Sequence, residues 1–164
     1  TTTMCLIPII HQAVKIPVIA AGGIASGRSM MAAFALGAAG VQIGSRFVLS
    51  EESSAHENFK NKVLETKEGD TILTLKKLTP VRMIKNEFYE KIADAENRCA
   101  REEELKSILG RARAKKGMYE GDLSEGELEI GQVAASVKRI MPAAAIVEEI
   151  WQEFVATKNE ICDL

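Results

Sequence analysis

Residues 16–48 constrain the fold of this chain more than any other segment, because they read as two apolar strands that each run into a glycine turn. The first predicted strand, Ile16–Ala21, is apolar on both faces, as in a covered parallel sheet. A helix is predicted over Gly27–Leu36, and a second apolar strand over Val41–Ile43. The order is β-turn-α-turn-β, for which the crossover is expected to be right-handed. Caps for the helix are predicted at Ser26 and Gly37.

The glycine turns after these two strands predict a phosphate site. Gly22 and Gly23 let a backbone approach a ligand closely, and the free N–H groups at the start of the following helix offer donors to an anion. Gly44 and Ser45 end the second strand in the same way. In (β/α)8 barrels the loops after strands seven and eight frequently hold phosphate, so this pair of loops is a candidate for them. The alternative is that the glycines only close tight turns.

Composition excludes several classes of partner. With 46% apolar residues, 27% charged residues and a net charge of −2, the chain has no basic field for nucleic acid, and no apolar run is long enough for a membrane span. Small molecules or proteins are the expected partners. Cys5, Cys99 and Cys162 are far apart, which indicates free thiols and a reducing, cytoplasmic compartment. With only His11 and His56, no metal site is predicted.

The chain is expected to be part of a larger protein. It has no initiator Met, and it contains two convincing βα units where a full (β/α)8 barrel takes about 250 residues. We therefore expect it to supply the last part of one barrel.

The flanking segments are predicted to be mainly helical. A helix precedes the first strand, with Pro8 tolerable only in its first turn. Ser54 and Glu57 form a capping box that places His56 in the first turn of another helix. There His56 either contacts a ligand near the phosphate loops or is a solvated residue. Thr71–Leu75 is predicted to be an edge strand or an extended arm.

Residues 81–117 are charged and almost free of glycine, and they are predicted to form a small helical insertion that starts near Val81. A basic cluster in this segment is interpreted as a solvated helix end, or as a contact for an anionic cofactor or carrier protein. A second capping box, at Ser124 and Glu127, marks a returning loop. Helices are predicted over 132–140 and 143–157, with Trp151 on the packed stripe of the second one. The basic cluster consists of Arg111, Arg113, Lys115 and Lys116.

The motifs IPVIAAGGIASG, GVQIGSRFV, SSAHENFK, LTPVRMIKN and GDLSEGELEIGQ resemble the family of FMN-dependent nitronate monooxygenases and enoyl-acyl-carrier-protein reductases II. The resemblance implies an α/β fold: the C-terminal part of an FMN-binding (β/α)8 TIM barrel with a small helical insertion after the last strand. It implies barrel units with the FMN phosphate loops over residues 1–70, the inserted domain over 71–125 and returning helices over 126–164. The implied phosphate-binding residues are Gly22, Gly23, Gly44 and Ser45, with Ala21 and Gln42 as weaker neighbours.

The resemblance assigns no catalytic residue to this chain. The family's catalytic histidine is expected in a Gly-Gly-His motif upstream of Thr1, so neither His11 nor His56 inherits that role. The segment Glu127–Ile130 departs from the small and Met residues that relatives often carry there. That departure leaves open what lines the substrate side.

By resemblance the activity is NADH- or NADPH-dependent reduction of the trans-2 double bond of an enoyl thioester on acyl carrier protein, in fatty acid synthesis. The alternative is a nitronate monooxygenase that oxidises alkyl nitronates with O2. A second alternative is a noncatalytic half-barrel that needs the missing N-terminal part of the barrel as its partner. A homodimer is expected from the resemblance.

Overall fold

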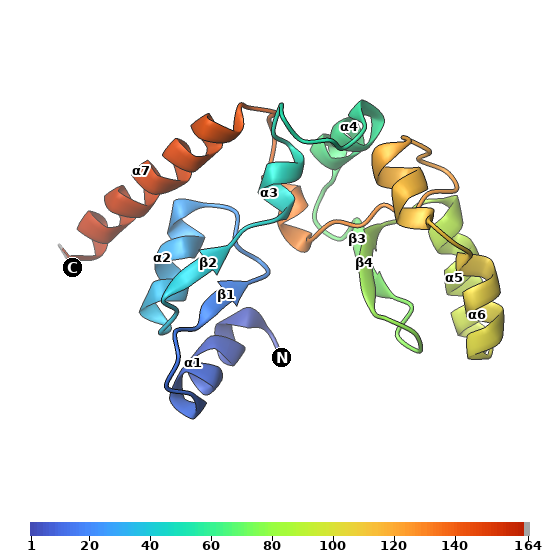
Figure 1. Cartoon of the computed structure of the whole chain (residues 1–164), viewed down its shortest axis with the longest axis horizontal. Coiled ribbons are helices and arrows are strands. Elements are labelled where there is room, and N and C mark those ends of the chain that lie inside the picture. Colours follow the sequence, from blue (N-terminus) through green and yellow to red (C-terminus); the bar gives the residue numbers. More distant parts are fainter. Residues whose placement is uncertain (163–164) are drawn as a thin grey trace. The chain divides into compact units, whose positions relative to one another are not determined.

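The computed structural model describes residues 1–162 and divides into two compact units (Figure 1). The first unit is Thr1–Glu52 with Ile140–Leu164, and the second unit is Ser53–Arg139. These limits differ from the predicted ranges 1–70, 71–125 and 126–164. The division into barrel units and an inserted domain therefore stays a prediction.

The first unit is built on a pair of parallel strands. β1 (Ile19–Ala21) pairs with β2 (Gly40–Gln42), and Ala20 lies opposite Val41. The predicted β-turn-α-turn-β order is confirmed. β1 starts three residues later than predicted, and β2 is shifted by one residue toward the N-terminus. The helices of this unit are α1 (Thr3–Ala13), α2 (Gly27–Ala35), α3 (Ser45–Val48) and α7 (Ala143–Cys162).

The two faces of this strand pair differ in burial. Ala20 lies in the apolar cluster formed with the helices, and Val41 packs against that cluster. Side chains alternate along a strand, so Ile19 and Ala21 lie on the opposite face, where Ile19 is 58% exposed. The described residues therefore cover only one face of β1, and coverage of the other face stays a prediction for the intact protein.

The ends of α2 form as predicted. The Ser26 hydroxyl accepts a hydrogen bond from the Ser29 backbone, and the Ser29 hydroxyl accepts one from the Ser26 backbone. At the other end Gly37 has φ +102°, and N–H groups of Gly37 and Ala38 donate back to the last turn. This pattern is a Schellman motif. α1 departs from its prediction, because Pro8 lies inside the helix beyond the first turn and contributes no N–H.

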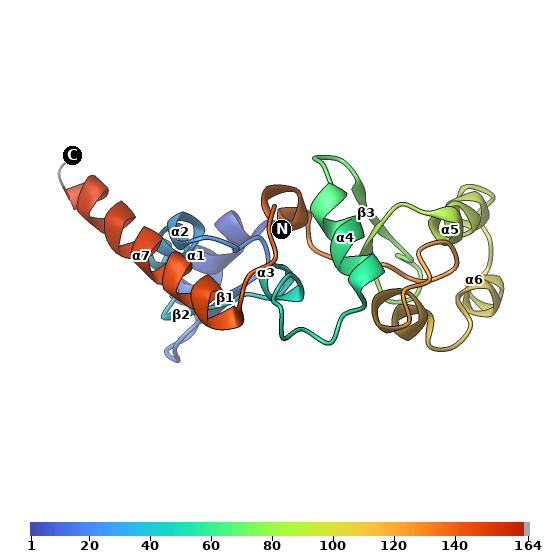
Figure 2. The same ribbon diagram turned by 90° about the horizontal axis from the view of Figure 1, so that it is seen from above.

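α7 is longer than the predicted helix and covers α2 (Figure 2). Ile146 and Ile150 are buried on the inner face of α7. Phe154 meets Phe34 of α2 with ring centroids 5.5 Å apart. Trp151 stacks on Phe154 but is 53% exposed, so it is less buried than its place on the apolar stripe predicts.

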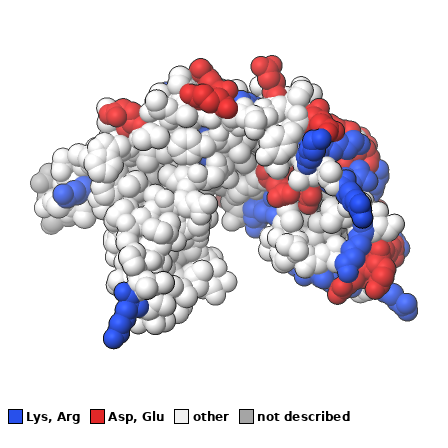
Figure 3. Space-filling view, viewed as in Figure 1, with Lys and Arg blue, Asp and Glu red and all other residues white. Residues whose placement is uncertain are grey.

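The second unit combines an antiparallel pair of strands with short helices. β3 (Thr71–Thr74) pairs with β4 (Val81–Ile84), so the helix predicted from Val81 is wrong. A strand forms here instead of a helix because it buries Met83 completely against Phe88 and Ile92 of the following helix. Charged side chains gather over this unit (Figure 3). Its helices are α4 (Glu57–Glu65), α5 (Glu87–Asn97) and α6 (Glu102–Leu109), with a π turn η1 (Lys115–Tyr119) and a 3-10 turn η2 (Gln132–Ser136).

Both S-x-x-E patterns fail to act as the predicted capping boxes. The N-cap of α4 is His56 instead of Ser54. Ser124 begins no helix; it lies in a turn held by the Asp122 carboxylate, which accepts the N–H of Ser124 and of Glu125. The helix predicted over 132–140 is only the short turn η2.

Cys99 carries a local strain that a glycine would relieve. It follows α5 at φ +58°, where its N–H donates to Glu96 O, as in a C′ position. We expect Cys99→Gly to raise the free energy of unfolding by about 1 kcal/mol, since non-glycine residues are disfavoured in this conformation. Urea denaturation checks this. The matched control is Cys5→Gly in the interior of α1, which should lower stability; equal effects would contradict the explanation.

Cys5, Cys99 and Cys162 are free and exposed, as predicted. No helix within residues 1–162 is long and apolar enough to cross a membrane.

Candidate functional site

The two predicted phosphate loops are brought together by the register of the strands. Ala21, the last residue of β1, lies opposite Gln42, the last residue of β2. The loop Gly22–Gly23 therefore starts beside the loop that contains Gly44 and Ser45. Ala21 and Gln42 are both exposed and share the face of the strand pair turned away from the helices.

The glycine loop after β1 has a backbone that only glycine adopts easily. Gly22 has φ +90° and Gly23 has φ +77°. A Cβ placed on Gly23 or on Gly44 would meet no atom within 4 Å, so the space over both loops is open. The Thr3 hydroxyl donates to Gly22 O at 3.0 Å and ties the loop to the start of α1. These loops have the exposed backbone and the open space that a phosphate group requires.

The first turn of α2 does not supply the predicted anion donors. The Gly27 N–H donates to the Glu153 carboxylate of α7 at 2.7 Å, and the Ser29 N–H is taken by Ser26. A carboxylate already occupies the positive end of this helix, where it would repel a second anion. The prediction that α2 binds phosphate through its N-terminus is therefore wrong. The loop amides at Gly22–Gly23 and Gly44–Ser45 remain as candidates.

Arg46 is a buried cation beside this site that the sequence analysis missed. It lies on α3, directly after Ser45, and is only 4% exposed. Its Nη2 lies 3.1 Å from Met141 Sδ and 3.7 Å from a Glu149 carboxylate oxygen of α7. The sequence did contain a signal for this burial: Arg46 is followed by the apolar residues Phe47, Val48 and Leu49. A charge next to such residues needs a partner if the segment is buried.

His56 has a structural role in the second unit. The ring Nδ1 of His56 accepts the Asn58 backbone N–H at 3.1 Å, and the backbone N–H of His56 donates to Met118 O. A Cβ on Gly121 would lie 2.2 Å from Nδ1, so the ring packs against the backbone there. Contact of His56 with a ligand stays a prediction. His11 similarly packs against Gly37.

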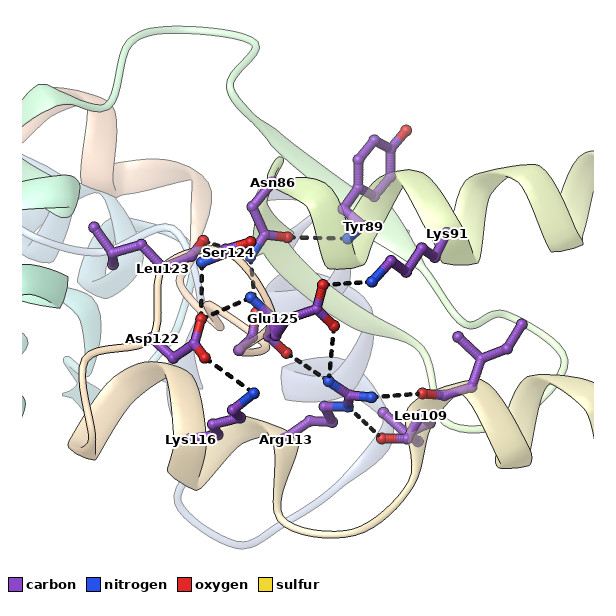
Figure 4. A network of polar contacts seen from close by, with 12 residues as sticks. Asn86, Tyr89, Lys91, Leu109, Arg113, Lys116, Asp122, Leu123, Ser124 and Glu125 are labelled. Carbon is purple, nitrogen blue, oxygen red and sulfur yellow. Dashed lines mark hydrogen bonds and ion pairs between the residues drawn. The ribbon is translucent and has the colours of Figure 1, made fainter.

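Three members of the basic cluster form ion pairs within the second unit, and Figure 4 shows those of Arg113 and Lys116. Arg113 donates to the carbonyls of Ile108 and Leu109 at the end of α6, and also to Glu125. Its guanidinium lies 5.0 Å from the centre of the Phe88 ring. Arg113 thus lies at a helix end, as predicted, but its side chain is only 25% exposed, so the prediction of a solvated end is wrong for this residue. Lys116 pairs with Asp122, and Lys115 pairs with Glu120.

These hydrogen bonds and ion pairs lower the pKa values of two acids in the turn, Asp122 and Glu125. Hydrogen bonds from the Glu125 backbone and from Lys116 lower the pKa of Asp122, and those from Lys91 and Arg113 lower the pKa of Glu125.

The burial of Glu127 and Glu129 is the second feature that the sequence did not predict, although the segment Glu127–Ile130 departs from the residues that relatives often carry there. Glu127 is 6% exposed. The backbone of Glu129 forms an isolated antiparallel β-bridge with Met83 of β4. Burial, reinforced by the Glu129 charge and partly offset by Arg113, raises the pKa of Glu127 to about 7. Burial also raises the pKa of Glu129. Neither acid forms a metal cluster; within residues 1–162 no group of three or more His, Cys, Asp or Glu is placed to hold a metal ion.

Comparison with known proteins gives a consistent family signal. A model of the nitronate monooxygenase family matches residues 1–153. A probable nitronate monooxygenase from Staphylococcus saprophyticus is 35% identical over 161 residues, which are 97% of this chain and 43% of that protein. One from Bacillus subtilis is 35% identical over 151 residues, 92% of this chain and 43% of that protein.

Solved structures agree with this signal. FabK from Thermotoga maritima matches 99% of this chain and 52% of its own, at 39% identity and a TM-score of 0.93. A nitroalkane oxidase from Streptomyces ansochromogenes matches 97% of this chain and 45% of its own, at 28% identity and a TM-score of 0.77. The predicted α/β fold of a partial barrel is confirmed. The chain spans about half the length of the relatives that it matches.

Proposed function

Because this chain belongs to the nitronate monooxygenase family, we propose that its loops Gly22–Gly23 and Gly44–Ser45 bind the phosphate of FMN. Ala21 and Gln42 flank the phosphate on the exposed face of the strand pair. The observation that carries the proposal is the parallel register, which joins two loops with open space over their backbones. FMN, when bound, supplies a centre that accepts and donates hydride or single electrons. The role of these residues is to bind and orient it.

We propose that the whole protein is an NADH- or NADPH-dependent enoyl-acyl-carrier-protein reductase. A hydride equivalent from the nicotinamide reaches the β-carbon of the enoyl thioester, and a proton is added to the α-carbon. The similarity to FabK, an enoyl-acyl-carrier-protein reductase II, supports this activity. No residue of this chain is assigned the proton transfer.

The second candidate is oxidation of alkyl nitronates with O2. The names of the curated relatives favour it, since those matched at 35% identity are probable nitronate monooxygenases. This reaction uses the same phosphate loops and needs no nicotinamide.

The third candidate is a noncatalytic half-barrel that pairs with the N-terminal barrel half. The exposed apolar residues Ile16 and Ile19 support such pairing, because an open strand face favours association. We propose that in the intact enzyme the other barrel strands cover this face. A homodimer in the cytoplasm is also proposed, and the three free cysteines support a reducing compartment.

Anaerobic absorbance spectroscopy of the intact protein tests these candidates. The reductase predicts that NADH or NADPH bleaches the flavin band and that crotonyl thioester restores it. Bleaching by an alkyl nitronate but not by nicotinamide would favour the monooxygenase. A colourless protein that cannot be reconstituted with FMN would reject both enzymes.

Gly23→Ala tests the phosphate loop itself. A side chain at φ +77° forces the loop to shift, so we expect the dissociation constant of FMN to rise about tenfold, equivalent to 1.4 kcal/mol. Flavin fluorescence titration measures it. Gly69→Ala is the matched control, since Gly69 has φ +84° and equally open surroundings but lies in the second unit, outside the phosphate loops. Similar loss of affinity in both variants would contradict the assignment.

A further inference from the structure

α7 is attached to the segment that follows the second phosphate loop. Its start is joined to residues just after α3 by three hydrogen bonds: Glu51 N to Met141 O at 3.0 Å, Met141 N to Leu49 O at 3.3 Å, and Ala143 N to the Glu52 carboxylate at 2.8 Å. Within α3, Arg46 reaches Glu149 on the second turn of α7. The position of α3 is therefore coupled to that of α7.

α7 also contacts the start of α2, which follows the first phosphate loop. Glu153 accepts the Gly27 N–H at 2.7 Å, at the first residue of α2. Gly27 packs directly on the α7 backbone, because a Cβ there would lie 2.2 Å from Phe154 N and 2.3 Å from Ile150 O. α2 and α7 lie side by side in both views (Figure 1, Figure 2).

The two acids that make these contacts lie on one face of α7. Glu149 and Glu153 are four residues apart, so they are neighbours along the helix surface. One contacts the helix after the Gly44–Ser45 loop, and the other contacts the helix after the Gly22–Gly23 loop. One rigid element thus spans both supports of the proposed phosphate site.

We propose that Glu149 and Glu153 of α7 are positioning residues that set the spacing of the two phosphate loops. The inference rests on the proposed function, since it assigns these residues to the FMN phosphate. Their negative charge cannot attract the phosphate, so their contribution is geometric: each holds the end of a segment that leads out of one loop. A loop amide displaced by a fraction of an ångström loses its hydrogen bond to a fixed anion.

The test compares FMN with riboflavin, which lacks the phosphate. In Glu153→Ala we expect the dissociation constant of FMN to rise about tenfold while that of riboflavin is unchanged, both measured by flavin fluorescence on the intact protein. In Glu153→Gln the amide oxygen still accepts the Gly27 N–H and the repelling charge is gone. FMN affinity in that variant should equal or exceed that of the unmodified protein.

Glu160→Ala is the matched control. Glu160 also lies on α7 and pairs with Arg28 of α2 at 2.8 Å, but both side chains are more than half exposed, so this ion pair holds α2 only weakly. We expect its FMN affinity to be unchanged. If Glu153→Ala does not fold, Glu149→Ala makes the same test through Arg46 and should also weaken FMN binding relative to riboflavin.

The outcomes separate this inference from the proposed function. If the unmodified protein binds FMN, but Glu153→Ala weakens FMN and riboflavin equally or Glu160→Ala behaves like it, the positioning role is overturned alone. If the unmodified protein has no FMN affinity, the proposed function fails and takes this inference with it. Selective loss of FMN binding in Glu153→Ala, with rescue in Glu153→Gln, supports it.

Discussion

Gly27→Ala is expected to lower the free energy of unfolding of the first unit by about 3 kcal/mol, despite the higher helix propensity of alanine. The added Cβ would lie 2.2 Å from Phe154 N and 2.3 Å from Ile150 O, both backbone atoms of α7 that no side-chain rotation can move. The two helices must separate, which also breaks the bond from Gly27 N to Glu153.

The single tryptophan makes this measurement specific to the first unit. Trp151 lies on α7 and stacks on Phe154, so its fluorescence reports when α7 leaves α2. Urea denaturation followed by this signal gives the change in stability. Arg28→Ala, at the next residue of α2, is the control and should change stability by less than about 1 kcal/mol, since its ion pair is exposed. If Gly27→Ala were no worse than this control, the close approach of the helices would be wrong.

Stability should fall as the pH rises from about 4.5 to about 7, because of Glu127. The pKa of this buried carboxyl is raised to about 7, so in this window the folded protein holds a proton that the unfolded chain has released. The folded state is therefore favoured at the acidic end, and the contribution is lost as the pH passes the folded pKa. The pKa of Glu127 is raised mainly by its own burial and further by the negative charge of Glu129, and the positive charge of Arg113 offsets only part of this shift. The loss amounts to about 3 kcal/mol.

Glu127→Gln should remove most of this slope, with the part due to the raised pKa of Glu129 remaining, and should leave the variant more stable than the unmodified protein at pH 8. Urea denaturation at pH 5, 6, 7 and 8, followed by far-ultraviolet circular dichroism, measures the difference between the two proteins. Glu125→Gln is the control: the pKa of Glu125 is lowered, so its contribution is lost only at more acidic pH and the slope above pH 5 should persist. An undiminished slope in Glu127→Gln would show that another group causes it.

Local signals predicted the first unit well. The caps at Ser26 and Gly37 depend on contacts within a few residues, and both formed as expected. The strands around the glycine loops were also identified, because apolar runs bounded by glycine leave few alternatives. The two loops proposed to bind phosphate follow these strands in the sequence, and the parallel register places them side by side.

The same kind of signal failed in the second unit. S-x-x-E occurs at Ser54 and at Ser124, but His56 caps α4 and Asp122 holds the other turn. Val81 began a strand instead of a helix, because pairing with β3 buries Met83. Short motifs state which hydrogen bonds are possible, and burial of neighbouring side chains decides which of them form.

Local sequence signals were enough to predict the two strands, the glycine loops and the helix caps, since these depend on backbone preferences and on hydrogen bonds between near neighbours. Contacts between distant parts of the chain were needed to show that a carboxylate 126 residues away accepts the first N–H of α2, that Arg46 is buried against α7, and that Glu127 has a raised pKa. These properties depend on which distant groups are brought into contact and on how much water they lose. Neither quantity is written in the spacing of residues along the chain.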